Sequence, residues 1–128
     1  MTGTASSPRY DAIVVGAGPA GCSAALWLMQ LGLRTLLVDR ADTPCAGLGG
    51  YHFRQDWVLG SPGQTLAEVG RHYADHVRSL AERHPKTLAL ALSSPVDAID
   101  HGAAGWQVHL AGGATATAAC LVLATGLV

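Results

Sequence analysis

A Gly-x-Gly-x-x-Gly motif between a strand-like and a helix-like segment is the feature that most constrains how this chain folds. Residues 12–21 read Ala-Ile-Val-Val-Gly-Ala-Gly-Pro-Ala-Gly. The β-branched residues before Gly16 are typical of a buried strand. The run of Ala, Leu and Met that follows is typical of a helix, and Gly32 supplies a C-terminal stop. The pattern therefore predicts a strand over residues 10–15 and a helix over residues 20–31.

Each glycine of the motif has a separate task when such a turn holds the pyrophosphate of a dinucleotide. Gly16 allows the tight turn, Gly18 lets the pyrophosphate approach the backbone, and Gly21 lets the helix pack against the strand. Pro19 suits the first helical turn because its missing N–H would have no intrahelical partner there. From Ala20 onward, the helix N-terminus presents free N–H groups and its positive dipole end to the phosphates.

A second apolar strand is predicted over residues 34–38, and it ends in Asp39. A carboxylate at this place can accept both hydroxyls of the adenosine ribose, and the whole βαβ unit has the expected length of about 30 residues. The alternatives are a Gly-rich turn in another α/β fold and a solvated Asp39 at a strand end. The carboxylate would repel a 2′-phosphate, which disfavours NADP at this site, although Arg40 keeps NADP open.

The rest of the chain predicts an α/β domain with a parallel sheet and a small antiparallel meander. A flexible leader over residues 1–9 precedes one domain over 10–128. The irregular stretch 41–63 is long enough to be functional or mobile. We expect a helix over 64–84, strands over 87–92, 96–100, 106–110 and 114–119 with a Gly112-Gly113 hairpin turn, and a buried parallel strand over 119–124.

Composition excludes several classes of protein. The chain has 128 residues, a net charge of -1 and 13% charged residues, so it shows no nucleic-acid-binding footprint. We see no apolar run long enough for a membrane span and no signal peptide, and we therefore expect a cytoplasmic location.

The three cysteines do not form a regular disulfide pattern, and there is no Cys-x-x-Cys pair. Cys45 is interpreted as a lone cysteine in a loop, without a partner for an internal disulfide. Cys22 is expected to be a small core residue at a helix start, and Cys120 to be buried strand packing. None of the three is predicted to be catalytic.

His72 and His76 have metal-ligand spacing on the predicted helix, but no third ligand is evident. We expect them on a solvated edge of the helix and predict no metal site. Trp27, on the first helix, is expected in the core or at a subunit contact.

Three segments together resemble the flavin-binding domain of thioredoxin-reductase-like, FAD-dependent pyridine nucleotide-disulfide oxidoreductases. They are the glycine motif at 16–21, Leu-Leu-Val-Asp-Arg at 36–40, and Cys-Leu-Val-Leu-Ala-Thr-Gly at 120–126. The Trp-Val-Leu-Gly-Ser-Pro-Gly run at 57–63 lies where that family has an aromatic loop near the flavin. The resemblance implies a Rossmann-like FAD/NAD(P)-binding fold.

The resemblance also implies which residues hold FAD in an extended form. Pyrophosphate contacts are expected from the start of the first helix, at Gly16, Gly18, Pro19, Ala20 and Gly21. The adenosine half is expected near Asp39, Arg40 and the backbone at Val96. The second motif places Ala124, Thr125 and Gly126 close to the cofactor. Tyr51, His52 and Trp57 either stack near the isoalloxazine or pack the loop onto the sheet.

The chain departs from that family in what would follow Val128. It has no second Gly-x-Gly-x-x-Gly, no dithiol motif and no later Gly-Asp motif, so the fold is expected to be incomplete at its C-terminus. NAD(P)H would then bind outside this chain, and a homodimer or a complementing chain would supply its domain. We also expect uncovered apolar surface near residues 121–123 and the first helix.

Two other functions stay open. One is a non-catalytic dinucleotide-binding module or remnant, which would bind FAD or NAD through the first βαβ unit alone. The other is an FAD-dependent monooxygenase, because that unit is shared across the superfold.

Overall fold

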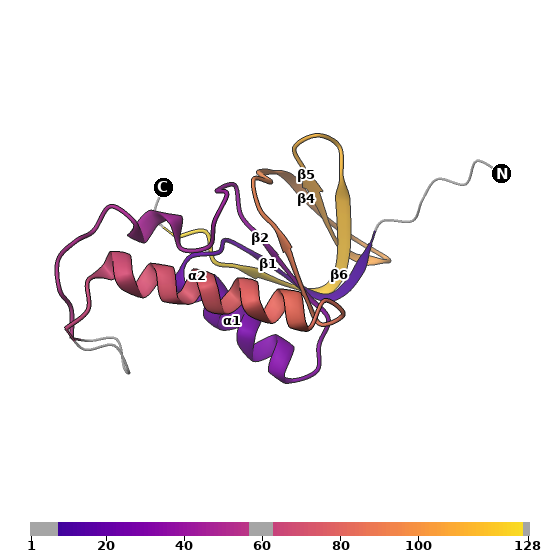
Figure 1. Cartoon of the computed structure of the whole chain (residues 1–128). Coiled ribbons are helices and arrows are strands. Elements are labelled where there is room, and N and C mark those ends of the chain that lie inside the picture. Colours follow the sequence, from indigo (N-terminus) through magenta and orange to yellow (C-terminus); the bar gives the residue numbers. More distant parts are fainter. Residues whose placement is uncertain (1–7, 57–62, 127–128) are drawn as a thin grey trace.

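A six-stranded mixed sheet forms the centre of the molecule, in a computed structural model that describes residues 8–56 and 63–126. The strand order is β3-β2-β1-β6-β5-β4 (Figure 1). Four strands run parallel: β1 (Arg9–Val15), β2 (Thr35–Val38), β3 (Leu88–Ala91) and β6 (Thr115–Leu123). The strands β5 (Gly105–Leu110) and β4 (Val96–Gly102) extend the sheet in antiparallel fashion. The predicted parallel sheet with an antiparallel meander is confirmed.

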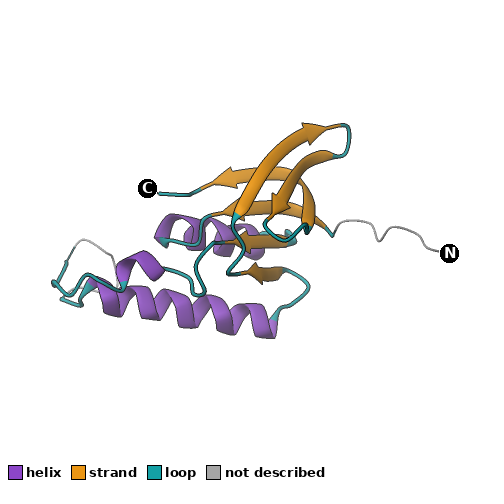
Figure 2. Cartoon of the chain, turned by 90° about the horizontal axis from the view of Figure 1, so that it is seen from above, coloured by secondary structure: helices purple, strands orange, loops and turns teal. Residues whose placement is uncertain are grey.

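Two helices cover one face of the parallel strands, as Figures 1 and 2 show. They are α1 (Pro19–Gln30) and α2 (Leu66–Arg83). The side chain of Thr65 caps α2 by accepting a hydrogen bond from the Glu68 amide, 3.1 Å away. The core on this face includes Val14, Cys22, Ala25, Leu37, Val77 and Leu88.

The meander folds over the opposite face of the parallel strands. Alternation along β1 and β2 sends every second side chain to this face, where these residues meet apolar side chains of β5 and β6. The resulting cluster consists of Ile13, Val15, Leu36, Val38, Val108, Leu110, Ala116 and Ala118. The strand β1 from Ala12 onward and the strand β2 are therefore buried on both faces, which explains their almost continuous apolar sequences.

The last strand differs from the prediction. Separate strands were expected over 114–119 and 119–124, but β6 is one continuous strand over Thr115–Leu123. Its pairing with β5 covers Thr115 to Ala118 and ends there, while its pairing with β1 continues to Leu123. No glycine or proline interrupts it, so nothing in the local sequence forces a break. Cys120 lies beyond the β5 pairing and is exposed, contrary to the expected burial.

Large apolar side chains are exposed where uncovered apolar surface was expected. Trp27 and Leu31 at the end of α1 are 66% and 70% exposed, and Leu123 on β6 is 64% exposed. Trp27 is therefore not a core residue of this chain. Within the described residues, no helix is both long and apolar enough to cross a membrane.

Other segment boundaries shift by a few residues. The predicted irregular stretch 41–63 contains a short 3-10 helix, η1 (Ala46–Leu48), and Arg54 forms an isolated bridge with Thr65. At the other end of the chain, β1 begins at Arg9, inside the predicted leader. Residues 1–7 of that leader and the loop residues 57–62, including Trp57, lie outside the described residues.

Candidate functional site

The carboxyl ends of the parallel strands meet at one edge of the sheet, and backbone hydrogen bonds hold the segments that leave them. The Gly16 amide donates to the Val38 carbonyl at 2.7 Å, and the Ala124 amide donates to the Val15 carbonyl at 2.8 Å. The Asp39 amide donates to the Ala91 carbonyl at 3.0 Å. In open α/β sheets this edge is where ligands bind. The predicted glycine turn, acidic residue and second motif therefore belong to one site.

Two glycines of the motif are required by close backbone packing. Gly16 has a φ of 106°, and a Cβ atom there would collide with the Ala124 carbonyl. A Cβ atom at Gly21 would collide with the Gly16 carbonyl. Both contacts confirm that β1, α1 and the end of β6 approach too closely for side chains at these positions.

Gly18 differs from these two glycines because no protein atom lies near its missing side chain. A Cβ atom at Gly18 would have nothing within 4 Å, and its φ of -75° is accessible to any residue. Packing within this chain therefore gives no reason for glycine here. Open space beside the backbone is what an approaching pyrophosphate requires.

No side chain of the first turn of α1 competes with a ligand for the free N–H groups at the N-terminus of this helix. No side chain caps it, and its first turn carries no acidic residue. Pro19 and Ala20 are both exposed in this first turn. The unused backbone N–H groups and the helix dipole suit an anion placed above Gly18.

Asp39 holds the glycine turn in place through its carboxylate. The Oδ2 atom accepts a hydrogen bond from the Ala17 amide at 2.6 Å, and Oδ1 accepts one from the Ala41 amide at 2.9 Å. Each carboxylate oxygen can accept a further hydrogen bond. Asp39 is half-buried, so it can order the turn and still accept ligand hydroxyl groups.

A cavity of about 400 Å³ opens beside Asp39 at this edge of the sheet. Its walls combine the end of β1, the end of β2 and the start of β4. The lining residues are Val15, Gly16, Val38, Asp39, Arg40, Ser94, Pro95, Val96 and Thr125. This volume lies within the range of small-molecule and cofactor sites. The cavity and the open space at Gly18 fit an adenine dinucleotide.

Five of the residues predicted for the site line this cavity: Gly16, Asp39, Arg40, Val96 and Thr125. Gly18, Pro19, Ala20 and Gly21 form the adjacent start of α1, and Ala124 supports Gly16 from behind. Gly126 has a φ of 71° and does not line the cavity. The contacts of these residues with a cofactor stay predictions.

Ser94 and Pro95 were missed by the sequence analysis. The Ser94 amide donates to the Asp39 carbonyl at 2.9 Å, which brings the segment after β3 against the end of β2. The available signal was their position directly after a parallel strand, at the edge where ligands bind.

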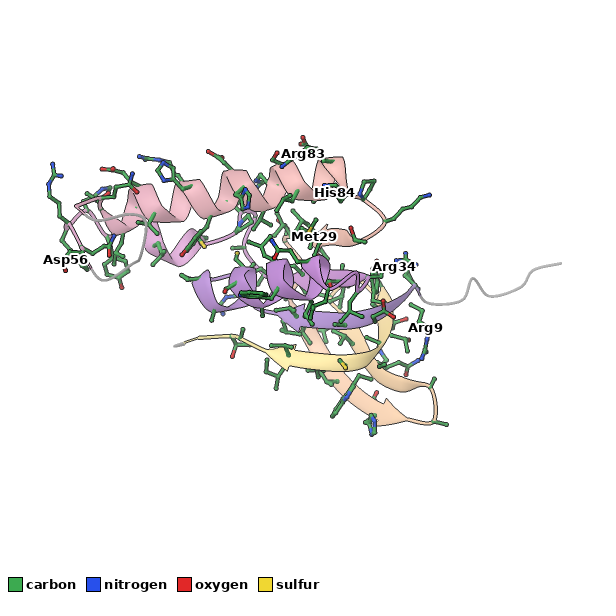
Figure 3. The ribbon with its side chains drawn as sticks, turned by 90° about the horizontal axis from the view of Figure 1, so that it is seen from below. Arg9, Met29, Arg34, Asp56, Arg83 and His84 are labelled. Atoms are coloured by element: carbon green, nitrogen blue, oxygen red, sulfur yellow. The ribbon has the colours of Figure 1, made fainter. Side chains whose placement is uncertain are left out.

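The basic side chains at the start of the sheet lie away from this site. Figure 3 shows Arg9 and Arg34 at the end of the sheet opposite the C-terminal end of β6. Arg9 donates to the Ala104 carbonyl at 2.8 Å, and the Arg34 guanidinium lies 4.8 Å from the centre of the Tyr10 ring. Arg40 is the cationic side chain among the residues lining the cavity.

The buried cysteines contradict the interpretation of Cys45 as a residue without a partner. The Sγ atoms of Cys22 and Cys45 lie 3.9 Å apart, and both residues are buried. A hydrogen bond from Cys22 lowers the pKa of Cys45, although burial opposes this shift. The same hydrogen bond and burial raise the pKa of Cys22 well above its ordinary value.

The two helix histidines are solvent-exposed, as expected. Among the residues that the structure describes, no group of three or more His, Cys, Asp or Glu side chains could hold a metal ion. Tyr51 and Phe53 pack edge to face with ring centres 5.9 Å apart, and both are about half exposed.

Comparison with known proteins finds a matching family and several curated relatives. The family described as "Pyridine nucleotide-disulphide oxidoreductase" matches residues 10–128. Thiamine thiazole synthase of Archaeoglobus fulgidus is 34% identical over 97 residues, which cover 72% of this chain and 37% of the relative.

Solved structures show the same fold. Thioredoxin reductase of T. acidophilum superposes with a TM-score of 0.76 at 24% identity, covering 92% of this chain and 36% of that chain. Thioredoxin reductase of Gloeobacter violaceus superposes with a TM-score of 0.70 at 25% identity, covering 94% and 38%. This chain therefore spans well under half the length of the proteins it matches.

Proposed function

Because the chain belongs to the pyridine nucleotide-disulphide oxidoreductase family, we propose that it is the FAD-binding portion of an FAD-dependent, NAD(P)H-linked oxidoreductase. The observation that carries the proposal is the cavity at the carboxyl edge of the sheet, with Asp39 on its wall and the glycine turn beside it. FAD, when bound, supplies the hydride-accepting and hydride-donating chemistry. This chain supplies binding and orientation.

In this proposal different residues of the site bind different parts of the cofactor. The start of α1 binds the pyrophosphate over Gly18, where no protein atom fills the space. Asp39 accepts the ribose hydroxyl groups with the acceptor capacity that its two backbone hydrogen bonds leave free. Val96 and Pro95 provide an apolar wall for the adenine.

Further protein is needed for turnover in this proposal. The matched reductase structures are more than twice as long as the part this chain covers. We propose that NAD(P)H binds outside residues 1–128, either on more of the same chain, on a second copy in a homodimer, or on a complementing chain. The exposed Trp27, Leu31 and Leu123 provide apolar area for such a contact.

The first experiment is the visible absorption spectrum of the purified chain after incubation with FAD and desalting. We expect a retained flavin band, together with binding of ADP in calorimetry. The matched variants are Gly18→Ala, which fills the open space, and Gly102→Ala, which adds the same methyl group to open space on the distant meander. Gly18→Ala should weaken both ligands, whereas Gly102→Ala should not.

The outcomes separate the proposal from its alternatives. Equal binding by both variants and the unchanged chain would contradict the assigned site. Binding of FAD or ADP without any bleaching of the flavin band by NAD(P)H, even with the additional protein present, would favour the non-catalytic module. Oxygen consumption with NAD(P)H and no disulfide substrate would favour a monooxygenase.

A cytoplasmic location is part of the same proposal. The three cysteines follow no regular disulfide pattern and include no Cys-x-x-Cys pair, which suits a reducing compartment. Cell fractionation with an antibody against the chain tests it, and recovery from an oxidising compartment would contradict it.

A further inference from the structure

Cys22 and Cys45 come from different elements and meet in the core behind the glycine turn. Cys22 is in the first turn of α1, and Cys45 directly precedes η1. Their exposed fractions are 1% and 4%, and their Sγ atoms are 3.9 Å apart. A disulfide requires about 2.05 Å, so the two sulfur atoms need to approach by only about 2 Å.

One carbonyl group organises both cysteines. The Ala17 carbonyl accepts the Cys45 amide at 2.6 Å and the Cys22 thiol at 3.4 Å. Cys22 has one S–H group, which lies near both the Ala17 carbonyl oxygen and the Cys45 sulfur atom, and donation to either acceptor favours the protonated form of Cys22. Cys45, in contrast, receives the hydrogen bond that favours its thiolate.

The backbone at Cys45 is held in a costly conformation that keeps the pair together. Cys45 has φ 55° and ψ 30°, in the left-handed region that non-glycine residues rarely adopt. Such conformations persist only where the surrounding structure enforces them, and they concentrate at functional sites. Here the hydrogen bond that the Cys45 amide donates to the Ala17 carbonyl enforces this conformation.

A groove gives small molecules a route to the pair. It lies between α1 and α2, has a volume of about 280 Å³, and is lined by Cys22, Ser23, Leu26, Trp27, Gln30 and Tyr73. Cys22 forms part of this wall although almost none of its surface is exposed. The groove therefore brings a reagent as small as hydrogen peroxide up to Cys22, whose Sγ atom lies 3.9 Å from that of Cys45.

We propose that Cys22 and Cys45 form a site of reversible oxidation, in which hydrogen peroxide converts the two thiols to an intramolecular disulfide. The Cys45 thiolate attacks one peroxide oxygen; the O–O bond breaks, and the leaving oxygen departs as water after taking up a proton. The Cys22 sulfur then attacks the resulting sulfenic acid; the S–S bond forms, the S–O bond breaks, and a second water leaves with the Cys22 proton. The two sulfur atoms lose two electrons in total, and the peroxide gains them.

The test uses the full chain with Cys120→Ser, because the exposed Cys120 would otherwise form intermolecular disulfides. After hydrogen peroxide, we expect intact-mass analysis to show the loss of two hydrogens and thiol titration to show the loss of both thiols. A non-reducing digest should contain one cross-linked peptide joining Cys22 to Cys45. Dithiothreitol should return both thiols. As a control, the same chain is treated with hydrogen peroxide after unfolding in urea, which shows how far the thiols oxidise when the folded structure does not hold them together.

Two results would overturn the proposal. One is that the folded chain keeps both thiols while the urea-unfolded chain is oxidised. The other is that the folded chain accumulates sulfinic acid on one cysteine and no cross-linked peptide. Because both readouts need no variant at Cys22 or Cys45, a folding defect cannot imitate either result.

The order of attack has its own test. In Cys22→Ser the sulfenic acid on Cys45 has no resolving thiol, so peroxide treatment followed by unfolding in urea that contains dimedone should label Cys45 sooner than it labels Cys22 in Cys45→Ser. Equal or reversed rates would overturn the assignment of Cys45 as the attacking residue. This proposal does not depend on FAD binding, so it can fail or succeed independently of the proposed function.

Discussion

The Asp39 carboxylate accepts a hydrogen bond from the Ala17 amide at 2.6 Å, and so connects the end of β2 directly to the glycine turn after β1. The residue that was predicted from its position to bind the ribose therefore also holds the glycine turn in shape. In the proposed function Asp39 also binds the ribose, so the nucleotide affinity and the stability of this edge would both depend on this one side chain.

Asp39→Asn should lower both stability and nucleotide affinity. The amide group of asparagine keeps one acceptor oxygen but places N–H groups against either Ala17 or Ala41, which leaves a backbone donor unsatisfied. We expect a loss of about 1–3 kcal/mol in the free energy of unfolding. Urea denaturation measures it, with Asp42→Asn, an exposed neighbour, as the control. Equal effects of the two variants would contradict the role of Asp39.

Gly21→Ala and Gly18→Ala should separate packing from binding. At Gly21 the new methyl group meets the Gly16 carbonyl, and we expect a loss of about 1–3 kcal/mol or more in unfolding free energy. At Gly18 the methyl group meets no protein atom, so stability should change by no more than about 0.5 kcal/mol. Thermal and urea unfolding of both variants check this, and a large destabilisation by Gly18→Ala would show that the space is not open.

Thr65→Ala should destabilise the start of α2. The Thr65 hydroxyl oxygen accepts the Glu68 amide, and loss of such a cap typically costs about 1 kcal/mol. Thr65→Ser keeps the oxygen and should retain most of the stability. The comparison of the two variants in urea denaturation isolates the cap, and a similar loss in both would assign the effect to the methyl group instead.

Trp27→Ser should leave stability nearly unchanged, whereas Leu37→Ala should not. Trp27 is 66% exposed on α1, while Leu37 is fully buried between the sheet and the helices. We expect a change within about 0.5 kcal/mol for Trp27 and a loss of about 2–5 kcal/mol for Leu37. Sedimentation at several concentrations should also show less self-association for Trp27→Ser. A large destabilisation by that variant would mean that Trp27 is covered.

Cys120 should react with iodoacetamide well before the other two cysteines. It is exposed, while Cys22 and Cys45 are buried, with exposed fractions of 1% and 4%. Mass spectrometry of timed samples should show one rapid addition at Cys120 and two more only in urea. Early labelling of Cys45 would show that the loop before η1 opens in the native chain.

The sequence by itself determined the elements whose signals are local. The order of strand, glycine turn, helix and second strand follows from β-branched residues, conformational needs of Gly16 and the helix-starting Pro19, and these effects act within a few residues. The fold class and the grouping of Gly16, Asp39 and Thr125 at one edge also followed, because parallel strands place their carboxyl ends together.

Only the tertiary structure decided the features that depend on distant pairing. Whether residues 115–123 form one strand or two depends on β1, which continues to pair with β6 after the pairing of β6 with β5 has ended. Cys120 lies in this part of β6 and is exposed. The contact of Cys22 with Cys45, and the approach of Ser94 to Asp39, join segments far apart in the chain. Such contacts arise from how the elements pack in space, and residue preferences along the chain carry no signal for them.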